Sequence, residues 1–106
     1  LKKNQNKKVL AFCGIAFPNK FFKSLKNIGY EVIKTKVFPD HYRYNLKDII
    51  KLKNCAKNYE LKLITTEKDI VRIPKKFHSF IDKVEIEFQF RDLSKIQKMI
   101  KNLIDK

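Results

Sequence analysis

Apolar residues along this chain form short runs that alternate with stretches of helical spacing. Three segments carry the apolar or alternating runs typical of strands, at 9–13, 30–38 and 61–65. Between them, apolar residues recur every three or four positions, which predicts two helices. The first helix begins at Pro18 and ends before Gly29, and the second begins after Asn45.

Each of these helices has an expected buried stripe. In the first helix the stripe is Phe21, Phe22, Leu25 and Ile28, and in the second it is Leu46, Ile49, Ile50, Leu52, Ala56 and Tyr59. Asn45 can cap the second helix, and Asp48 three residues later brings it close to a capping box. Phe17, directly before Pro18, offers no side chain that could cap the first helix.

The second half of the chain continues the alternation. Thr66 can cap a short helical turn, after which Ile70, Val71 and Ile73 are expected to face inward. Segment 74–80 has no periodicity and is predicted to be a loop with His78 exposed. Strict alternation from Val84 to Phe90 predicts a strand near a sheet edge, and Asp92 begins a last helix that runs to Ile104.

Strand followed by helix, repeated, predicts an α/β fold. We expect a three-layer, Rossmann-like lobe with a mostly parallel sheet of about four strands and helices on both faces. The 106 residues suffice for one domain, which we place at 9–106, with 1–8 as a linker or tail. No apolar run approaches the roughly 18 residues that a membrane span needs.

Ligands of parallel α/β sheets bind at the carboxyl ends of the strands, which directs attention to three loops. These loops are 14–19, 39–44 and 65–69, and the second is the richest in polar residues. Its His41 follows Pro39, which stiffens the loop, and a His can take a proton from a substrate hydroxyl. The alternative is that His41 only packs or caps the next helix.

The run from Thr65 to Asp69 also has two interpretations. Thr66 as a cap followed by acidic residues in the first turn would simply start a helix well. The same residues could instead face a ligand, with Lys68 available for an anion. Cys13, Cys55 and the two histidines lack zinc-ligand spacing, so no metal site is expected.

The formal net charge of +14 is ambiguous. Of 25 basic residues, 22 are Lys and only three are Arg, and Lys, Asn, Ile and Phe all have AT-rich codons. A biased genome would therefore produce this composition without selection for a basic surface. The alternative is an anionic partner, either nucleic acid or a membrane surface, although a preference for Lys over Arg argues against base readout.

Three segments together resemble the C-terminal part of the tetraacyldisaccharide 4'-kinase family. They are Ala11-Phe12-Cys13-Gly14-Ile15-Ala16-Phe17-Pro18, Phe38-Pro39-Asp40-His41-Tyr42, and Thr65-Thr66-Glu67-Lys68-Asp69 followed by Val71-Arg72. Their order and spacing fit the family from Val9 onward. At Phe17 the family commonly has a polar residue.

The resemblance implies a lipid A kinase at the cytoplasmic face of the bacterial inner membrane. Such a kinase transfers the γ-phosphate of ATP, with Mg²⁺, to the 4'-hydroxyl of a tetraacyldisaccharide 1-phosphate. The family's motif histidine maps onto His41 and is expected to pair with a carboxylate of the N-terminal lobe. Asp40, Thr66, Glu67, Lys68 and Asp69 would line or brace the cleft between the lobes.

The phosphate-binding loop of such kinases is missing from this sequence. That loop needs the pattern G-x-x-x-x-G-K-[ST], whereas the chain has only Gly14 and Gly29. We therefore expect a C-terminal fragment that binds ATP and Mg²⁺ mainly through an absent N-terminal lobe, supplied by the same or another chain, and that is inactive alone. The alternatives are a stand-alone basic module that binds nucleic acid or anionic lipid, and a non-functional gene remnant.

Overall fold

Four parallel strands form a single sheet in the computed structural model, which describes residues 7–85. The strands are β1 (Lys8–Cys13), β2 (Glu31–Val37), β3 (Lys62–Thr66) and β4 (Ile81–Val84). Their order in the sheet is β2-β1-β3-β4, and every neighbouring pair is parallel. The predicted α/β class and parallel sheet are confirmed.

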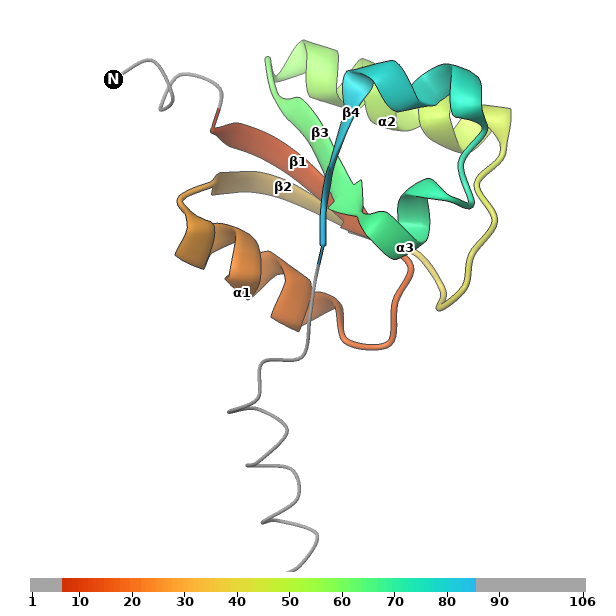
Figure 1. The fold of residues 1–106 in the computed structure, drawn as a ribbon. Helices are drawn as coiled ribbons and strands as arrows, with labels where there is room; N and C mark the ends of the chain where they lie inside the picture. Colours follow the sequence, from red (N-terminus) through yellow and green to blue (C-terminus); the bar gives the residue numbers. More distant parts are fainter. Residues whose placement is uncertain (1–6, 86–106) are drawn as a thin grey trace, which may run out of the picture.

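Helices cover both faces of this sheet, as predicted. They are α1 (Pro18–Ile28), α2 (Leu46–Asn58), the short α3 (Glu67–Ile70) and a 3-10 helix, η2 (Lys75–Phe80). Figure 1 shows α1 on one side of the sheet and α2 on the other. The result is the three-layer arrangement that alternating strands and helices favour.

The central strand β1 explains why its sequence is continuously apolar. Leu10 and Phe12 belong to the core beneath α2, whereas Val9, Ala11 and Cys13 belong to the core beneath α1. All five are at most 2% exposed. A strand buried on both faces needs apolar side chains at every position, so the alternation typical of half-exposed strands is lost.

The helix ends behave as their sequences predict. Asn45 and Asp48 form the full capping box at the start of α2, and Thr66 caps α3. Gly29 ends α1 with a left-handed φ of 114°. Phe17 provides no side-chain cap for α1, as expected.

Several side chains of the predicted apolar stripes are exposed, and this part of the prediction was wrong. The exposed members are Ile28, Leu46, Ile50, Tyr59 and Val71. A helix that lies on a small sheet buries only the centre of its stripe, so α2 buries Ile49, Leu52 and Ala56 and leaves the flanks in solvent. At the end of α3, Ile70 and the following Ile73 are buried, whereas Val71 between them in sequence is exposed.

The prediction of an unstructured loop at 74–80 was also wrong. After Pro74 the chain forms η2, in which Phe77 and Phe80 make an edge-to-face pair against the core. His78 is half-buried rather than exposed, and its Nε2 lies 2.8 Å from the Ile73 carbonyl oxygen. Local aromatic packing supplies the order that the sequence period does not reveal.

The boundaries of the outer segments differ in part from the sequence prediction. Lys8 already belongs to β1, and β4 begins at Ile81, three residues before the predicted strand. Among the strands of residues 7–85, β4 lies at a sheet edge, as expected. The remainder of the strand predicted to Phe90, the predicted helix at 92–104 and residues 1–6 lie outside the described residues.

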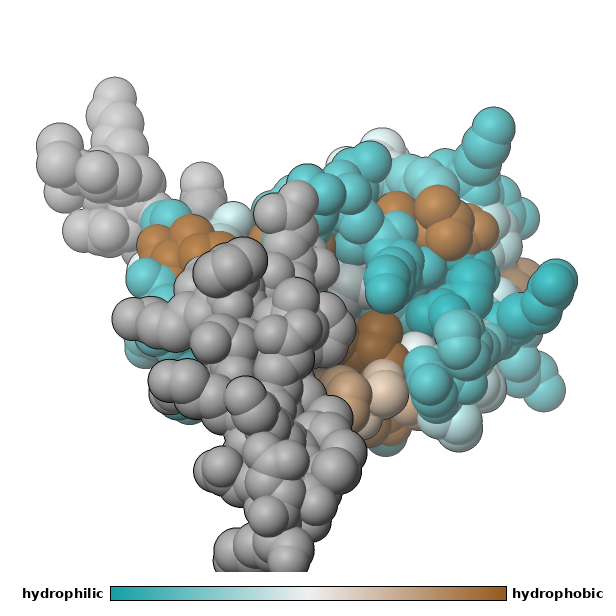
Figure 2. All heavy atoms as spheres, turned by 60° about the horizontal axis from the view of Figure 1, so that its bottom comes forward, coloured by the Kyte–Doolittle hydropathy of each residue, from teal (hydrophilic) through white to brown (hydrophobic). Residues whose placement is uncertain are grey.

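The face of residues 7–85 that Figure 2 presents is largely hydrophilic. In the view of Figure 2 the coloured surface is mostly teal, and the apolar patches are small and separate. None of the helices in this part of the chain has the length and hydropathy to cross a membrane.

Candidate functional site

The direction in which successive strands are added to the sheet changes between β1 and β3. The chain runs from β1 outward to β2 and then returns past β1 to β3, which places a crevice beyond the carboxyl ends of β1 and β3. A cavity of about 380 Å³ lies there. It is lined by Ile15, Ala16, Phe17, Lys20, Asp40, His41, Thr66, Glu67, Lys68, Arg72 and Glu85.

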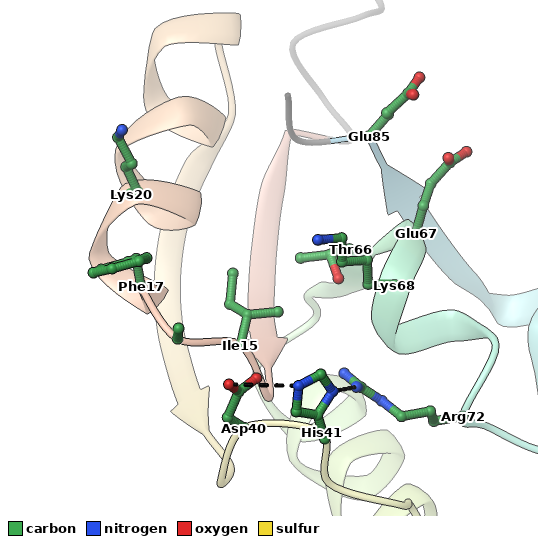
Figure 3. Close-up of a pocket in the computed structure, with 11 residues that line it drawn as sticks. Ile15, Phe17, Lys20, Asp40, His41, Thr66, Glu67, Lys68, Arg72 and Glu85 are labelled. Carbon is green, nitrogen blue, oxygen red and sulfur yellow. Dashed lines mark hydrogen bonds and ion pairs between the residues drawn. The ribbon is translucent and has the colours of Figure 1, made fainter. Parts of the chain in front are cut away.

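The structure brings together most of the site residues expected from the sequence. Asp40 and His41 form one wall, and Thr66, Glu67 and Lys68 come from the start of α3 on another, as Figure 3 shows. Asp69, the sixth candidate, is fully buried and does not line the cavity.

A tight turn presents His41 to the cavity. The Tyr42 N–H donates to the Pro39 carbonyl at 3.0 Å, and His41 has a φ of 64°, the sign that the third residue of a type II turn requires. The His41 N–H donates across the site to the Gly14 carbonyl, also at 3.0 Å. The backbone of this loop is therefore fixed from both sides.

The imidazole of His41 is open to solvent but has two polar neighbours. Its side chain is 84% exposed, so it neither packs in the core nor caps α2. Nδ1 lies 3.3 Å from Nη1 of Arg72, and Nε2 lies 3.7 Å from Oδ2 of Asp40 (Figure 3). The alternative that His41 packs in the core or caps the next helix is therefore wrong, since Asn45 caps α2.

Asp69 holds the three loops together from below. Four groups donate to its carboxylate: the Gly14 N–H at 2.9 Å, the Tyr44 hydroxyl at 3.0 Å, the Thr66 hydroxyl at 2.6 Å and Nη2 of Arg72 at 2.6 Å. These donors come from all three carboxyl-end loops and the segment after α3. Asp69 is thus a bracing residue, because burial of a carboxylate is tolerated only when its oxygens accept such hydrogen bonds.

Thr66 caps the short helix, as one of the two sequence interpretations expects, and it also lines the cavity. Its hydroxyl oxygen accepts the Asp69 N–H at 3.0 Å and so caps α3, while the residue also lines the cavity. Glu67 and Lys68 are exposed at the same helix start. The same residues therefore start α3 and form part of the cavity wall.

Burial keeps two ionisable groups beneath the cavity neutral. Desolvation, with a smaller contribution from the Asp69 charge, raises the pKa of Cys13 to about 12. Desolvation and then Asp69 also raise the pKa of Tyr44 well above its ordinary value. Since a thiol is nucleophilic only as thiolate, Cys13 is not a nucleophile despite its place at the end of β1.

Stacked aromatic rings support the loop that carries His41. The rings of Phe38 and Tyr42 stack with centroids 4.9 Å apart, and Tyr44 meets both of them edge-on. The Tyr42 hydroxyl donates to Asp48 at 2.8 Å, a hydrogen bond that raises the pKa of Tyr42. The aromatic residues of this loop thus stabilise its conformation.

Arg72 and Gly14 were not among the predicted site residues, although both lie in segments that the sequence singled out. Nη2 of Arg72 donates to Asp69 and to the Gly14 carbonyl, at 2.6 and 3.1 Å. A Cβ on Gly14 would lie 2.7 Å from the Pro39 carbonyl oxygen, so only glycine fits. The spacing of Asp69 and Arg72, three residues apart around a helix end, was the available signal.

Residues 7–85 contain no group of three His, Cys, Asp or Glu side chains that could hold a metal ion.

These features define a parallel α/β domain with a polar cavity at the carboxyl edge of its sheet. The family model of tetraacyldisaccharide-1-P 4'-kinase matches residues 1–105, so the chain belongs to that family. No solved structure matches it.

Individual relatives agree with the family assignment. The chain is 31% identical to a tetraacyldisaccharide 4'-kinase of Methylobacterium radiotolerans over 92% of its own length and 30% of the relative's. It is 50% identical to that of Methylobacterium nodulans and 46% identical to that of Rickettsia bellii, over 62% and 66% of this chain and 20% and 22% of the relatives. The chain thus spans less than a third of each of these relatives.

Proposed function

We propose that this chain is the C-terminal lobe, at 9–106, of a kinase that phosphorylates the 4'-hydroxyl of a tetraacyldisaccharide 1-phosphate with ATP. The observation that carries the proposal is the cavity at the strand switch of a chain belonging to this family. Its walls are built by the segments whose sequences resemble the family.

Within this lobe, His41 is the residue we assign to the reaction. Its backbone is fixed and its imidazole is exposed at the cavity, which suits a group that must meet a second lobe or a substrate. Asp40, Thr66, Glu67 and Lys68 line the same cavity, and Asp69 braces it. Lys68 and Arg72 supply positive charge on a wall that would face phosphate.

The nucleotide site belongs, in this proposal, to the N-terminal lobe. Phosphoryl transfer depends on backbone amides and cations that position the phosphates, and two glycines 15 residues apart cannot form a P-loop. ATP and Mg²⁺ would therefore be held mainly outside this chain. The isolated 106 residues are expected to transfer no phosphate.

The substrate's chemistry also suggests where the lobe works. A lipid with an anionic headgroup lies in a negatively charged membrane surface, and the chain carries a net charge of +14. We place it at the cytoplasmic face of the bacterial inner membrane as a peripheral protein.

A chimera tests the proposal directly. This chain would replace the matching segment of the Rickettsia bellii tetraacyldisaccharide 4'-kinase, and phosphate transfer from ATP to tetraacyldisaccharide 1-phosphate would be measured. We expect an active chimera, an inactive isolated chain, and a loss in kcat of about 10²- to 10⁴-fold for His41→Asn. Asn suits the positive φ of this position, so the variant should keep the turn.

His78→Asn is the matched control, because it makes the same chemical change outside the cavity. A folded but inactive chimera would overturn the assignment as a kinase lobe. An unchanged kcat in His41→Asn would remove His41 from the mechanism. Binding of the chain to nucleic acid or to anionic vesicles that weakens steeply with salt, together with an inactive chimera, would favour the basic-module alternative.

A further inference from the structure

One guanidinium connects the buried frame of the site with its exposed histidine. Nη2 of Arg72 is occupied by the Asp69 carboxylate at 2.6 Å and the Gly14 carbonyl at 3.1 Å, whereas Nη1 lies 3.3 Å from Nδ1 of His41. The Arg72 side chain is only 17% exposed, so it is held from below. Figure 3 shows it beside His41, opposite Asp40.

The chemistry of arginine determines the state of the histidine in this contact. A guanidinium has donors and no acceptor, so Nδ1 of His41 must be the acceptor and carry no proton. The proton of the neutral imidazole then resides on Nε2. That nitrogen lies 3.7 Å from Asp40 on the other side of the ring.

We propose that Arg72 is a positioning residue that fixes His41 as its Nε2–H tautomer. This inference rests on the proposed function and deepens it, because it assigns a direction to the proton of His41. In this state Nε2 donates a hydrogen bond and cannot accept the proton of a hydroxyl. His41 would then orient a carboxylate, of Asp40 or of the second lobe, and that carboxylate would act as the base.

Lysine cannot replace Arg72 in this role, although it can replace its charge. The two ends of the guanidinium fork serve Asp69 and His41 separately, whereas an ammonium group is a single point. The buried carboxylate attracts a cation more strongly than a neutral imidazole does. Arg72→Lys should therefore keep the ion pair and the fold while it loses the contact with His41.

The tautomer can be measured in the 106-residue chain itself. Long-range ¹H–¹⁵N correlation spectra separate the two ring nitrogens of a neutral His widely when one tautomer dominates, and the resonances approach each other when both are populated. We expect a wide separation for His41 in the wild type and a narrower one in Arg72→Lys and Arg72→Met. Arg43→Lys, an exposed position two residues after His41 in the same loop, is the matched control and should change nothing.

An unchanged separation in both Arg72 variants, with folding verified by circular dichroism, would overturn the proposal. Since Arg72→Lys retains a partner for Asp69, it keeps the test valid even where Arg72→Met fails to fold.

The chimera adds a kinetic test. Arg72→Lys should lower kcat about 10- to 100-fold, the range found when a partner that orients a metal-bound His is lost, and leave KM nearly unchanged. In the His41→Asn background the same change should have no further effect, because Arg72 acts through His41. Equal losses in both backgrounds would show that Arg72 itself acts on the reacting groups.

The two proposals fail in different ways. Full activity of His41→Asn would overturn the role of His41 in the proposed function, while the spectra could still show that Arg72 sets its tautomer.

Discussion

Replacement of Asp69 by Asn should destabilise the domain by about 3 kcal/mol, because it removes a buried charge that several donors share. The carboxylate is fully buried, and three donors converge on Oδ1: the Gly14 N–H, the Tyr44 hydroxyl and Nη2 of Arg72. Asn keeps the shape and can still offer one oxygen to these donors. It removes the negative charge that strengthens all three hydrogen bonds.

The magnitude follows from those contacts. A hydrogen bond to a charged group contributes about 1.5–3 kcal/mol and a neutral one about 0.5–1.5, so three bonds lose roughly 3 kcal/mol together. Leaving Arg72 without its buried partner gives a similar figure, about 3–5 kcal/mol. A domain of this size has about 5–15 kcal/mol of stability, so the variant should fold and remain measurable.

Urea unfolding followed by far-UV circular dichroism measures this loss, since the chain contains no Trp to report by fluorescence. Asp82→Asn is the matched control. Asp82 is about half exposed and lies 3.9 Å from Lys62, so its loss should cost about 0–1 kcal/mol. A difference between the two variants below about 0.5 kcal/mol would refute the bracing role of Asp69.

Two further predictions concern the same edge of the sheet. Gly14→Ala should cost about 1–3 kcal/mol in unfolding experiments, because its Cβ would lie 2.7 Å from the Pro39 carbonyl oxygen; a loss below about 0.5 kcal/mol would contradict this close approach. Cys13 has a folded pKa of about 12 against an ordinary 9.0, so its contribution to stability is complete below pH 9 and is lost as the pH rises toward 12. The unfolding free energy should therefore fall more steeply between pH 9 and 12 in the wild type than in Cys13→Ala, and parallel curves would show that Cys13 does not titrate in this way.

Much of the fold could be predicted from the sequence because local and global signals agree. The continuous apolar run at 9–13 predicts a buried strand, and the box of Asn45 and Asp48 defines the start of α2. Segment 74–80 could not be predicted in the same way. Its order comes from Phe77 and Phe80 packing on distant residues, which no local period records.

The candidate site, too, could be predicted from the sequence only in part. The loops at strand ends could be predicted, since topology alone brings Asp40, His41 and the start of α3 to one edge. The sequence could not predict which residue lines the cavity and which braces it. Asp69 and Lys68 are adjacent in sequence and differ only in the direction in which their side chains leave a short helix. Arg72 gained its place through contacts with residues 31 and 58 positions away.

The architecture connects the stability of this edge with the geometry of an exposed group. Asp69 is fixed by the loops that it joins, Arg72 is fixed by Asp69, and His41 receives its hydrogen bond from the free end of Arg72. A substitution of Asp69 should therefore change the hydrogen bonding of the His41 imidazole, which is connected to it through Arg72. On the proposed function, this lobe contributes an oriented hydrogen-bond donor to the reaction, and the phosphate-binding machinery lies in the other lobe. Asp69→Asn in the chimera should consequently lower kcat even at temperatures where the domain remains fully folded.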